Sequence, residues 1–207
     1  MTTAGDDRSG GDRRADQPAD DDQWVFLIDP AWQAQAEAGA GADEAASADG
    51  PPLEAVVGGW LVTADGSVGR FRANPDYEPS RPGSPTDPVD ATLQLLMRGE
   101  IDSDALFAVI KESVFDVALD ADGRPIIAPS PDDVPSLLVS TAPAQRFRVH
   151  VDDWRAEVSA AELSGLLQEY QVDVLFNPGG PASIRLIGDV FAEYVGAEQG
   201  PATRKAP

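Results

Sequence analysis

Carboxylates are the most abundant groups in this 207-residue sequence that could carry chemistry, with 36 Asp and Glu against 15 Lys and Arg. Adjacent acids at Asp20–Asp22, at 132–133 and at 152–153 could in principle hold a hard cation such as Ca²⁺. A calcium loop needs acids at alternate positions followed by a glycine and a distal glutamate, and the segment 116–123 lacks that order. Solvated acidic faces are therefore the favoured interpretation, and we expect no metal site.

The single histidine, His150, could act as a general base if a carboxylate oriented it. Polar Arg148 and His150, however, alternate with apolar neighbours over 147–151, a pattern typical of an extended segment with the imidazole on its solvent side. We therefore favour an exposed, non-catalytic histidine. The chain has no cysteine, which excludes disulfides, thiolate nucleophiles and zinc sites that need sulfur.

Serines and glycines do not form known catalytic or phosphate-binding motifs in this sequence. No serine stands in a Gly-x-Ser-x-Gly elbow or a Ser-x-x-Lys motif. The glycine pairs at 58–59 and 179–180 lie in no Gly-x-x-x-x-Gly-Lys or Gly-x-Gly-x-x-Gly frame, so they are interpreted as turn or close-packing glycines. The sequence thus predicts a protein that is not an enzyme and needs no cofactor.

The segment 174–186 contains a more specific sequence pattern than its amino-acid composition alone would suggest. Asn177, Pro178 and Gly179 follow an apolar strand and form a turn signal, because proline presets one φ angle and glycine supplies a positive one. The simpler interpretation is a strand, a tight turn and a return segment. The functional alternative makes the exposed turn and Arg185 a docking point for a partner carboxylate.

The net charge of −21 argues against nucleic acid and anionic lipid as partners, because both are polyanions. No apolar run approaches the ~20 residues of a membrane span, and residues 1–22 lack the apolar centre of a signal peptide. We therefore expect a cytoplasmic protein without direct membrane insertion.

Composition divides the chain into a disordered acidic arm over 1–22, a single α+β domain over 23–197 and a disordered tail over 198–207. Within the domain, the apolar run from Trp24 to Ile28 predicts a strand that Asp29 and Pro30 close. The Ala-, Gly- and acid-rich stretch that follows, 33–52 and above all 36–52, predicts a mobile loop.

Two hairpins are predicted around Asp-Gly turns, at 64–67 between 56–62 and 68–71, and at 120–123 between 114–119 and 125–128. Too many prolines occur over 74–85 for a regular element, so this segment is a predicted surface crossing. Helices are predicted from their caps after Asp87-Pro88, at Ser103 and after the Ser159/Glu162 capping box, and a closing amphipathic helix spans 189–195. Buried strands are predicted at 137–140 and 172–176. The fold class is α+β, a mixed and mostly antiparallel sheet with hairpins and three to four packed helices.

The order of these elements over about residues 93–190 resembles the SseB-like domain family. The resemblance rests on the strand 114–119 with its Asp-Gly turn, the strand ending at Ser140, the Leu163 helix, and the strand that leads into the turn 177–179. It implies an SseB-like arrangement of this part of the fold.

The wider chain is similar to bacterial type VII secretion system-associated proteins. The similarity rests on uncommon strings at 24–32, 55–60, 71–79 and 84–88. It implies an accessory or regulatory protein that acts through protein–protein contact, and it brings no catalytic residues.

We therefore expect a non-enzymatic protein-interaction module whose partner is a component or substrate of that secretion system. The alternatives are an acidic immunity- or chaperone-like inhibitor of a basic partner and a small-ligand hydrolase that uses surface acids. The oligomeric state stays open. Candidate contact residues are Trp60, Phe71, Tyr77, Asn177 and Arg185.

Overall fold

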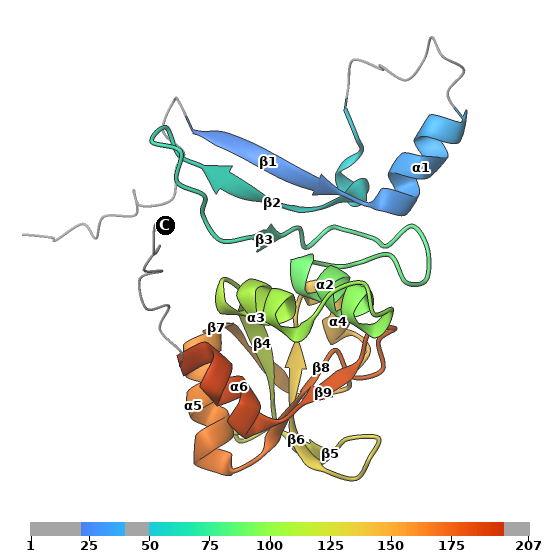
Figure 1. Cartoon of the computed structure of the whole chain (residues 1–207). Helices are drawn as coiled ribbons and strands as arrows, with labels where there is room; N and C mark the ends of the chain where they lie inside the picture. The colour runs from blue at the N-terminus through green and yellow to red at the C-terminus, as the bar shows by residue number, and fades with distance from the viewer. Residues whose placement is uncertain (1–21, 40–49, 197–207) are drawn as a thin grey trace, which may run out of the picture.

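The computed structural model describes residues 22–39 and 50–196, which form two layers (Figure 1). The upper layer is a three-stranded sheet with the order β1-β2-β3, and the lower layer is a six-stranded sheet packed with helices. Most strand pairs are antiparallel, which confirms the predicted α+β class. Residues 1–21 of the arm predicted over 1–22, and the tail predicted over 198–207, lie outside the described residues.

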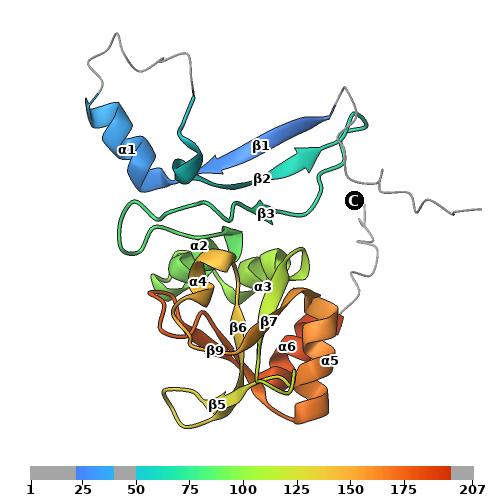
Figure 2. The ribbon, with the colours of Figure 1, turned by 180° about the vertical axis from the view of Figure 1, so that it is seen from behind.

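The upper sheet pairs β1 (Gln23–Ile28) with β2 (Val56–Val62), and β2 with the short β3 (Arg72–Ala73). The predicted Trp24 strand is therefore present, and it belongs to the upper sheet rather than to the larger lower sheet. Figures 1 and 2 show β3 nearest the lower layer and β1 as the far edge. The predicted turn at 64–67 is also present, since the Thr63 amide donates to the Ser67 carbonyl at 2.9 Å. Its return arm, however, contributes only an isolated bridge at Val68 before β3.

The predicted loop was wrong over 33–39, where the chain continues the helix α1 (Pro30–Gly39). Asp29 Oδ1 accepts the amides of Ala31 at 2.8 Å and Trp32 at 3.4 Å, so the residue that closes β1 also caps this helix. Alanine and glutamine favour helix, and Pro30 is preorganised for the first turn. Residues 40–49 of the predicted loop lie outside the described part, and a 3-10 turn (Leu53–Ala55) leads into β2.

The lower sheet has the order β7-β4-β6-β8-β9, with β5 also paired to β6. Its strands are β4 (Val114–Leu119), β5 (Ile127–Pro129), β6 (Pro135–Ser140), β7 (Asp153–Ser159), β8 (Asp173–Phe176) and β9 (Ile184–Leu186). Among the strands of the described residues, β6 and β8 are the only parallel pair. The predicted turn at 120–123 forms, but β5 pairs with β6 because β4 already has β6 and β7 on its two sides.

The lower-layer helices are α2 (Pro88–Met97), α3 (Ser103–Lys111), α4 (Pro143–Arg146), α5 (Ala160–Tyr170) and α6 (Gly188–Gly196). Asp87 caps α2, and the Ser159/Glu162 capping box begins α5, as predicted. The extended segment predicted over 147–151 was wrong, because the chain turns there after α4. His150 is nevertheless exposed.

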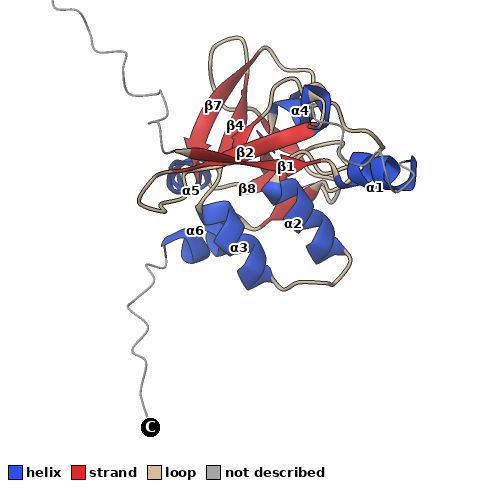
Figure 3. Cartoon of the chain, turned by 90° about the horizontal axis from the view of Figure 1, so that it is seen from above, coloured by secondary structure: helices blue, strands red, loops and turns tan. Residues whose placement is uncertain are grey.

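The main core lies between the lower sheet and the helices α2, α3, α5 and α6; Figure 3 shows α2, α3 and α6 on one side of the strands and α4 on the other. The opposite face carries a smaller apolar cluster on Ala118, Leu138 and Leu175, which the segment around Val149 and Val151 covers. Both faces of the lower sheet are therefore packed. Among the described residues, no helix is long and apolar enough to cross a membrane. The main core residues are Val89, Leu93, Leu106, Phe107, Ile110, Phe115, Val117, Leu137, Val139, Val158, Leu163, Leu167, Val174, Phe176 and Phe191.

Candidate functional site

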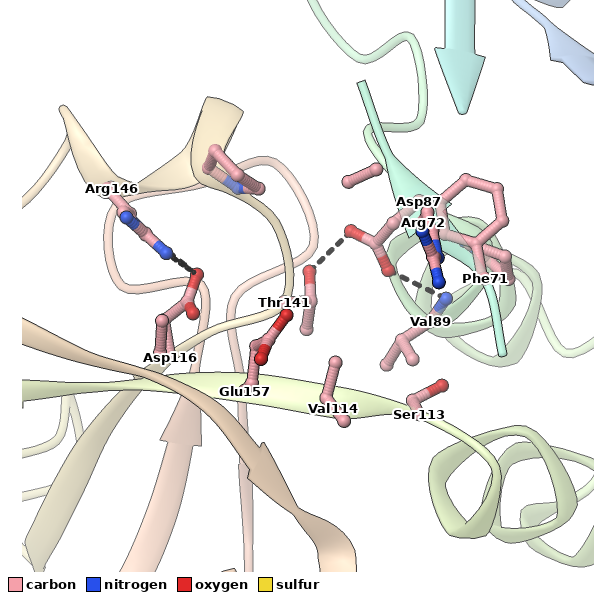
Figure 4. Close-up of a pocket in the computed structure, with 14 residues that line it drawn as sticks. Phe71, Arg72, Asp87, Val89, Ser113, Val114, Asp116, Thr141, Arg146 and Glu157 are labelled. Atoms are coloured by element: carbon pink, nitrogen blue, oxygen red, sulfur yellow. Dashed lines mark hydrogen bonds and ion pairs between the residues drawn. The ribbon is translucent and has the colours of Figure 1, made fainter. Parts of the chain in front are cut away.

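A cleft of about 580 Å³ lies between β3 and the lower layer (Figure 4). Its floor is formed by β4 and β7, one wall by the start of α2, the other by α4 and the residue after β6, and its roof by β3. Every one of these elements ends or bends at this place, so five segments distant in sequence contribute side chains. The charged and hydroxyl side chains that line the cleft are Arg72, Asp87, Ser113, Asp116, Thr141, Arg146 and Glu157.

The floor contains a β-bulge that presents Glu157. Val117 pairs with Arg155 and Phe115 with Val158, so Ala156 and Glu157 together oppose Asp116. Glu157 adopts φ 59°, a left-handed conformation that favours glycine and costs an L residue energy. Figure 4 shows its carboxylate rising from the strand into the cleft. Glu157 is exposed, and its side chain makes no hydrogen bond or ion pair with any described residue.

Asp116 and Arg146 form an ion pair on the wall beside the bulge. The Arg146 Nε and one terminal nitrogen each donate to Asp116 Oδ2 at 2.7 Å. Asp116 is 7% exposed, and the two charges compensate each other inside the cleft. The arginine therefore leaves no uncompensated positive charge to meet a ligand at this wall.

Asp87 forms the opposite wall, where it caps α2. Its Oδ1 accepts the amides of Val89 at 2.8 Å and Asp90 at 3.0 Å, and its Oδ2 accepts the hydroxyls of Thr141 at 2.6 Å and Thr86 at 2.9 Å. Burial, with a contribution from the neighbouring Asp90 carboxylate, raises the pKa of Asp87 to about 6 despite these bonds. Burial also raises the pKa of Asp90. Asp87 thus titrates closer to neutrality than an exposed aspartate.

Asn177 connects this wall to the lower sheet, and the structure places it differently from the exposed turn that the sequence suggested. It is 1% exposed, adopts φ 46°, and its amide oxygen accepts the Thr141 backbone N–H at 2.9 Å. Its side-chain nitrogen donates to Thr141 Oγ1 at 2.9 Å. Asn177 therefore joins the ends of β6 and β8 and supports the hydroxyl that bonds Asp87.

An apolar groove of about 480 Å³ adjoins the cleft and shares Phe71, Pro88 and Ser113 with it. The rings of Trp60 and Phe71 meet edge to face, with centroids 4.9 Å apart, on the side of the upper sheet that faces α3. Two of the five predicted contact residues are thus brought together here. The other lining residues of the groove are Val68, Gly69, Arg70, Ala108, Val109 and Glu112.

Tyr77 lies away from the cleft, in the crossing segment, and is 4% exposed. Its hydroxyl lies 3.1 Å from both Asp29 Oδ2 and the Pro85 carbonyl oxygen, and burial beside Asp29 raises its pKa. Asp29 also accepts the Ser80 amide at 2.9 Å and the Ser84 hydroxyl at 3.1 Å. Burial would raise the pKa of Asp29, but these hydrogen bonds, with that of Ala31, outweigh it and lower the pKa. The cluster anchors the crossing segment to the upper layer.

Arg185 lies on β9 and does not line the cleft. Its Nε donates to Asp132 Oδ1 at 3.1 Å, and another nitrogen donates to Asp173, so its guanidinium is already bound to carboxylates of its own chain. The bonds from Arg185 and Ser130 lower the pKa of Asp132 to about 2. The turn and return segment predicted here are present, and docking of a partner at Arg185 stays a prediction.

Sequence reasoning missed the side chains that shape the cleft. Asp87 was recognised only as a helix cap, and Thr141 and Glu157 carried no motif. The Asp87-Pro88 signal could have placed a carboxylate beside the end of β6, but nothing in the sequence announces the bulge that turns Glu157 inward. Within residues 22–39 and 50–196, no group of three or more His, Asp or Glu is placed to hold a metal ion.

No protein-family model, curated protein or solved structure matches this chain.

Proposed function

We propose that this chain is a non-enzymatic protein-interaction module, a cytoplasmic accessory of type VII protein secretion, that holds a basic and partly apolar segment of a partner protein between its two layers. The observation that carries the proposal is that the apolar groove, with its two aromatic rings, adjoins the cleft, which contains an unpaired carboxylate, under the upper sheet. The secretion system itself comes from the resemblance of the strings at 24–32, 55–60, 71–79 and 84–88 alone.

The groove supports the apolar half of this proposal. Trp60 and Phe71 are half-buried, and Val109 and Pro88 complete an apolar lining that water solvates poorly. Rings of this kind provide most of the binding energy where an interface buries them. An apolar side chain of a partner would displace water from the groove without breaking a hydrogen bond.

Charge supports the basic half. Asp116 compensates Arg146, and Asp87 is bonded on both oxygens, so Glu157 is the carboxylate of the cleft left for an incoming group. A lysine or arginine side chain can place its stem along Val114 or Pro143 and its cation at Glu157. The net charge of −21 steers a basic segment toward the molecule before contact.

The same contacts favour binding over catalysis. Acid–base chemistry by a carboxylate pair needs two groups free to exchange protons with a substrate. Asp87 accepts four hydrogen bonds within the chain, and Asp116 is held by Arg146. A hydrolase would need a second uncommitted group beside Glu157.

The test compares secretion of type VII substrates in cells with and without the gene, then complements the deletion with variants. Ala108→Trp fills the groove from the exposed face of α3. The control, Ala161→Trp, adds the same ring to an exposed position of α5 that lines neither the cleft nor the groove. Glu157→Gln removes the unpaired carboxylate of the cleft and keeps its shape.

We expect wild type and Ala161→Trp to restore secretion, and Ala108→Trp and Glu157→Gln to fail at wild-type protein levels. Unchanged secretion in the deletion strain, with the system active, would exclude the accessory role. Restored secretion by both site variants would exclude the cleft and groove as the docking place.

A further inference from the structure

The outer edge of the upper sheet is open. β1 has β2 on one side and no strand on the other among the described residues. Natural proteins protect such edges with charged side chains, proline or bulges, because unpaired backbone groups recruit other strands. β1 reads Gln-Trp-Val-Phe-Leu-Ile, without a charge or a proline, and its one irregularity lies at the last step, between Leu27 and Ile28.

The hydrogen-bond pattern shows which backbone groups this edge presents. On β2, the carbonyls of Leu61 and Val57 accept amides from the β3 side, at 2.8 Å from Gly69 and 3.0 Å from Asn74. Because groups alternate along an antiparallel strand, Trp60 and Gly58 face β1 and bond their opposite residues. The residues between those partners, Trp24 and Phe26, direct their N–H and C=O groups to the open edge.

The side chains at the edge are apolar on both faces. Trp24 and Phe26 share one face and stack with ring centroids 6.1 Å apart, at 36% and 58% exposure. Val25 lies on the other face at 52% exposure. β1 and β2 together contain no charged residue, in a chain that is 25% charged. Strands apolar on both faces are typical of sheets that are covered on both faces.

We propose that a second copy of this chain adds its β1 antiparallel to this edge, about a two-fold axis at Val25, and so forms a continuous six-stranded upper sheet. Trp24 then lies opposite the partner's Phe26, and Phe26 opposite the partner's Trp24, and each of these pairs exchanges two backbone hydrogen bonds. Val25 meets the partner's Val25 on the axis. The inference is independent of the proposed function, because the open edge is not part of the cleft or the groove.

The strand is self-complementary, which is why the occupant is a second copy. The two residues with outward backbone groups are both aromatic and flank Val25 symmetrically, so a two-fold operation pairs ring with ring on one face. No like charges meet within the paired strands. Figure 2 shows the lower layer on the β3 side of the sheet, so the two lower layers would lie at opposite ends of the dimer.

The experiment is sedimentation equilibrium of the full chain, from about 0.05 M to about 0.5 M NaCl. We expect twice the mass of one chain, with tighter association at higher salt, because the net charge of −21 on each copy repels and salt screens it. Val25→Lys places two ammonium groups against each other on the axis and should weaken association by about 100-fold. An equimolar mixture of Val25→Lys with Val25→Glu should restore the dimer as a heterodimer.

Backbone pairing is separated from side-chain contact by two changes at one position. Phe26→Pro removes an outward N–H that β2 does not use, whereas Phe26→Ala removes the ring and keeps the N–H. We expect the proline variant to dissociate more readily than the alanine variant, and Phe147→Lys, at an exposed apolar position of the lower layer, to dimerise like wild type. A monomeric wild type, a Val25→Lys dimer, or association that weakens with salt would each overturn the proposal.

Discussion

The lower sheet buries its apolar side chains on both faces, whereas the upper sheet leaves many of its own in contact with water. Phe176 on β8 and Val139 on β6 are 0% exposed, while Phe26 and Val25 on β1 are 58% and 52% exposed. Helices cover one face of the lower sheet and the segment around Val149 and Val151 covers the other, whereas β1, at the edge of the upper sheet, stays exposed.

The upper layer is held by polar contacts together with the buried first half of β2. Asp29 is 0% exposed and accepts hydrogen bonds from α1 and from the crossing segment, with Tyr77 packed beside it. We therefore expect the lower layer to contribute most of the stability of the fold, and the exposed strand β1 to provide a surface for association.

Removing one phenylalanine from each sheet tests this difference between the two layers most directly. Phe176→Ala leaves a cavity in the main core and should lower the free energy of unfolding by about 3–5 kcal/mol. Phe26→Ala removes a ring that already contacts water and should cost less than about 1 kcal/mol in the monomer, measured in the Val25→Lys background. Urea unfolding followed by circular dichroism measures both. Equal losses would mean that the upper sheet is part of the stabilising core.

The two layers each contain a buried aspartate, and the pKa values of these two groups are shifted in opposite directions. Burial raises the pKa of Asp87 in the lower layer to about 6, while hydrogen bonds lower that of Asp29 in the upper layer. Between an unfolded value near 3.8 and about 6, the folded chain binds the Asp87 proton more tightly than the unfolded chain. Lowering the pH from 7 to about 4 should therefore gain up to about 3 kcal/mol from Asp87.

Asp29 affects the free energy of unfolding in the opposite direction, because its pKa is lowered in the folded chain. Its stabilising contribution is present above the unfolded pKa and is lost as the pH falls below about 4. Asp87→Asn still caps α2 but cannot titrate, so urea unfolding at pH 7 and pH 5 should show a smaller gain in this variant than in wild type. The same gain in both proteins would assign the pH dependence to the general acidity of the chain rather than to Asp87.

Local signals in the sequence predicted the lower layer well. Asp87-Pro88 and the Ser159/Glu162 box begin helices where expected, and the apolar runs at 137–140 and 172–176 are buried strands. Asp29-Pro30 is the same cap signal as Asp87-Pro88, but the Ala- and Gly-rich residues after it favoured a loop. The helix α1 shows that the cap was the stronger signal.

The candidate site was harder to predict, because it depends on pairing between distant strands. Trp60 and Phe71 could be placed from the alternation of the first hairpin. Asn177, by contrast, was expected in an exposed turn, and only the parallel pairing of β6 with β8 turns its side chain inward to Thr141. Glu157 faces the cleft because of a bulge against β4, and the strand β7 itself was not predicted.

The smallest change in the free energy of unfolding is expected at two residues in the left-handed conformation. They are Glu157 in the cleft, with φ 59°, and Gln171 at the end of α5, with φ 53°. Glycine adopts this conformation without steric cost, so Glu157→Gly and Gln171→Gly should each raise the free energy of unfolding by up to about 1 kcal/mol. Gln171 closes a helix on the surface, whereas Glu157 presents the unpaired carboxylate of the cleft. Urea unfolding should therefore show the same gain for both, while only Glu157→Gly should fail to restore secretion in the deletion strain. If both variants restored secretion, the Glu157 carboxylate would not be needed for docking, and its left-handed conformation would matter only for the geometry of the bulge.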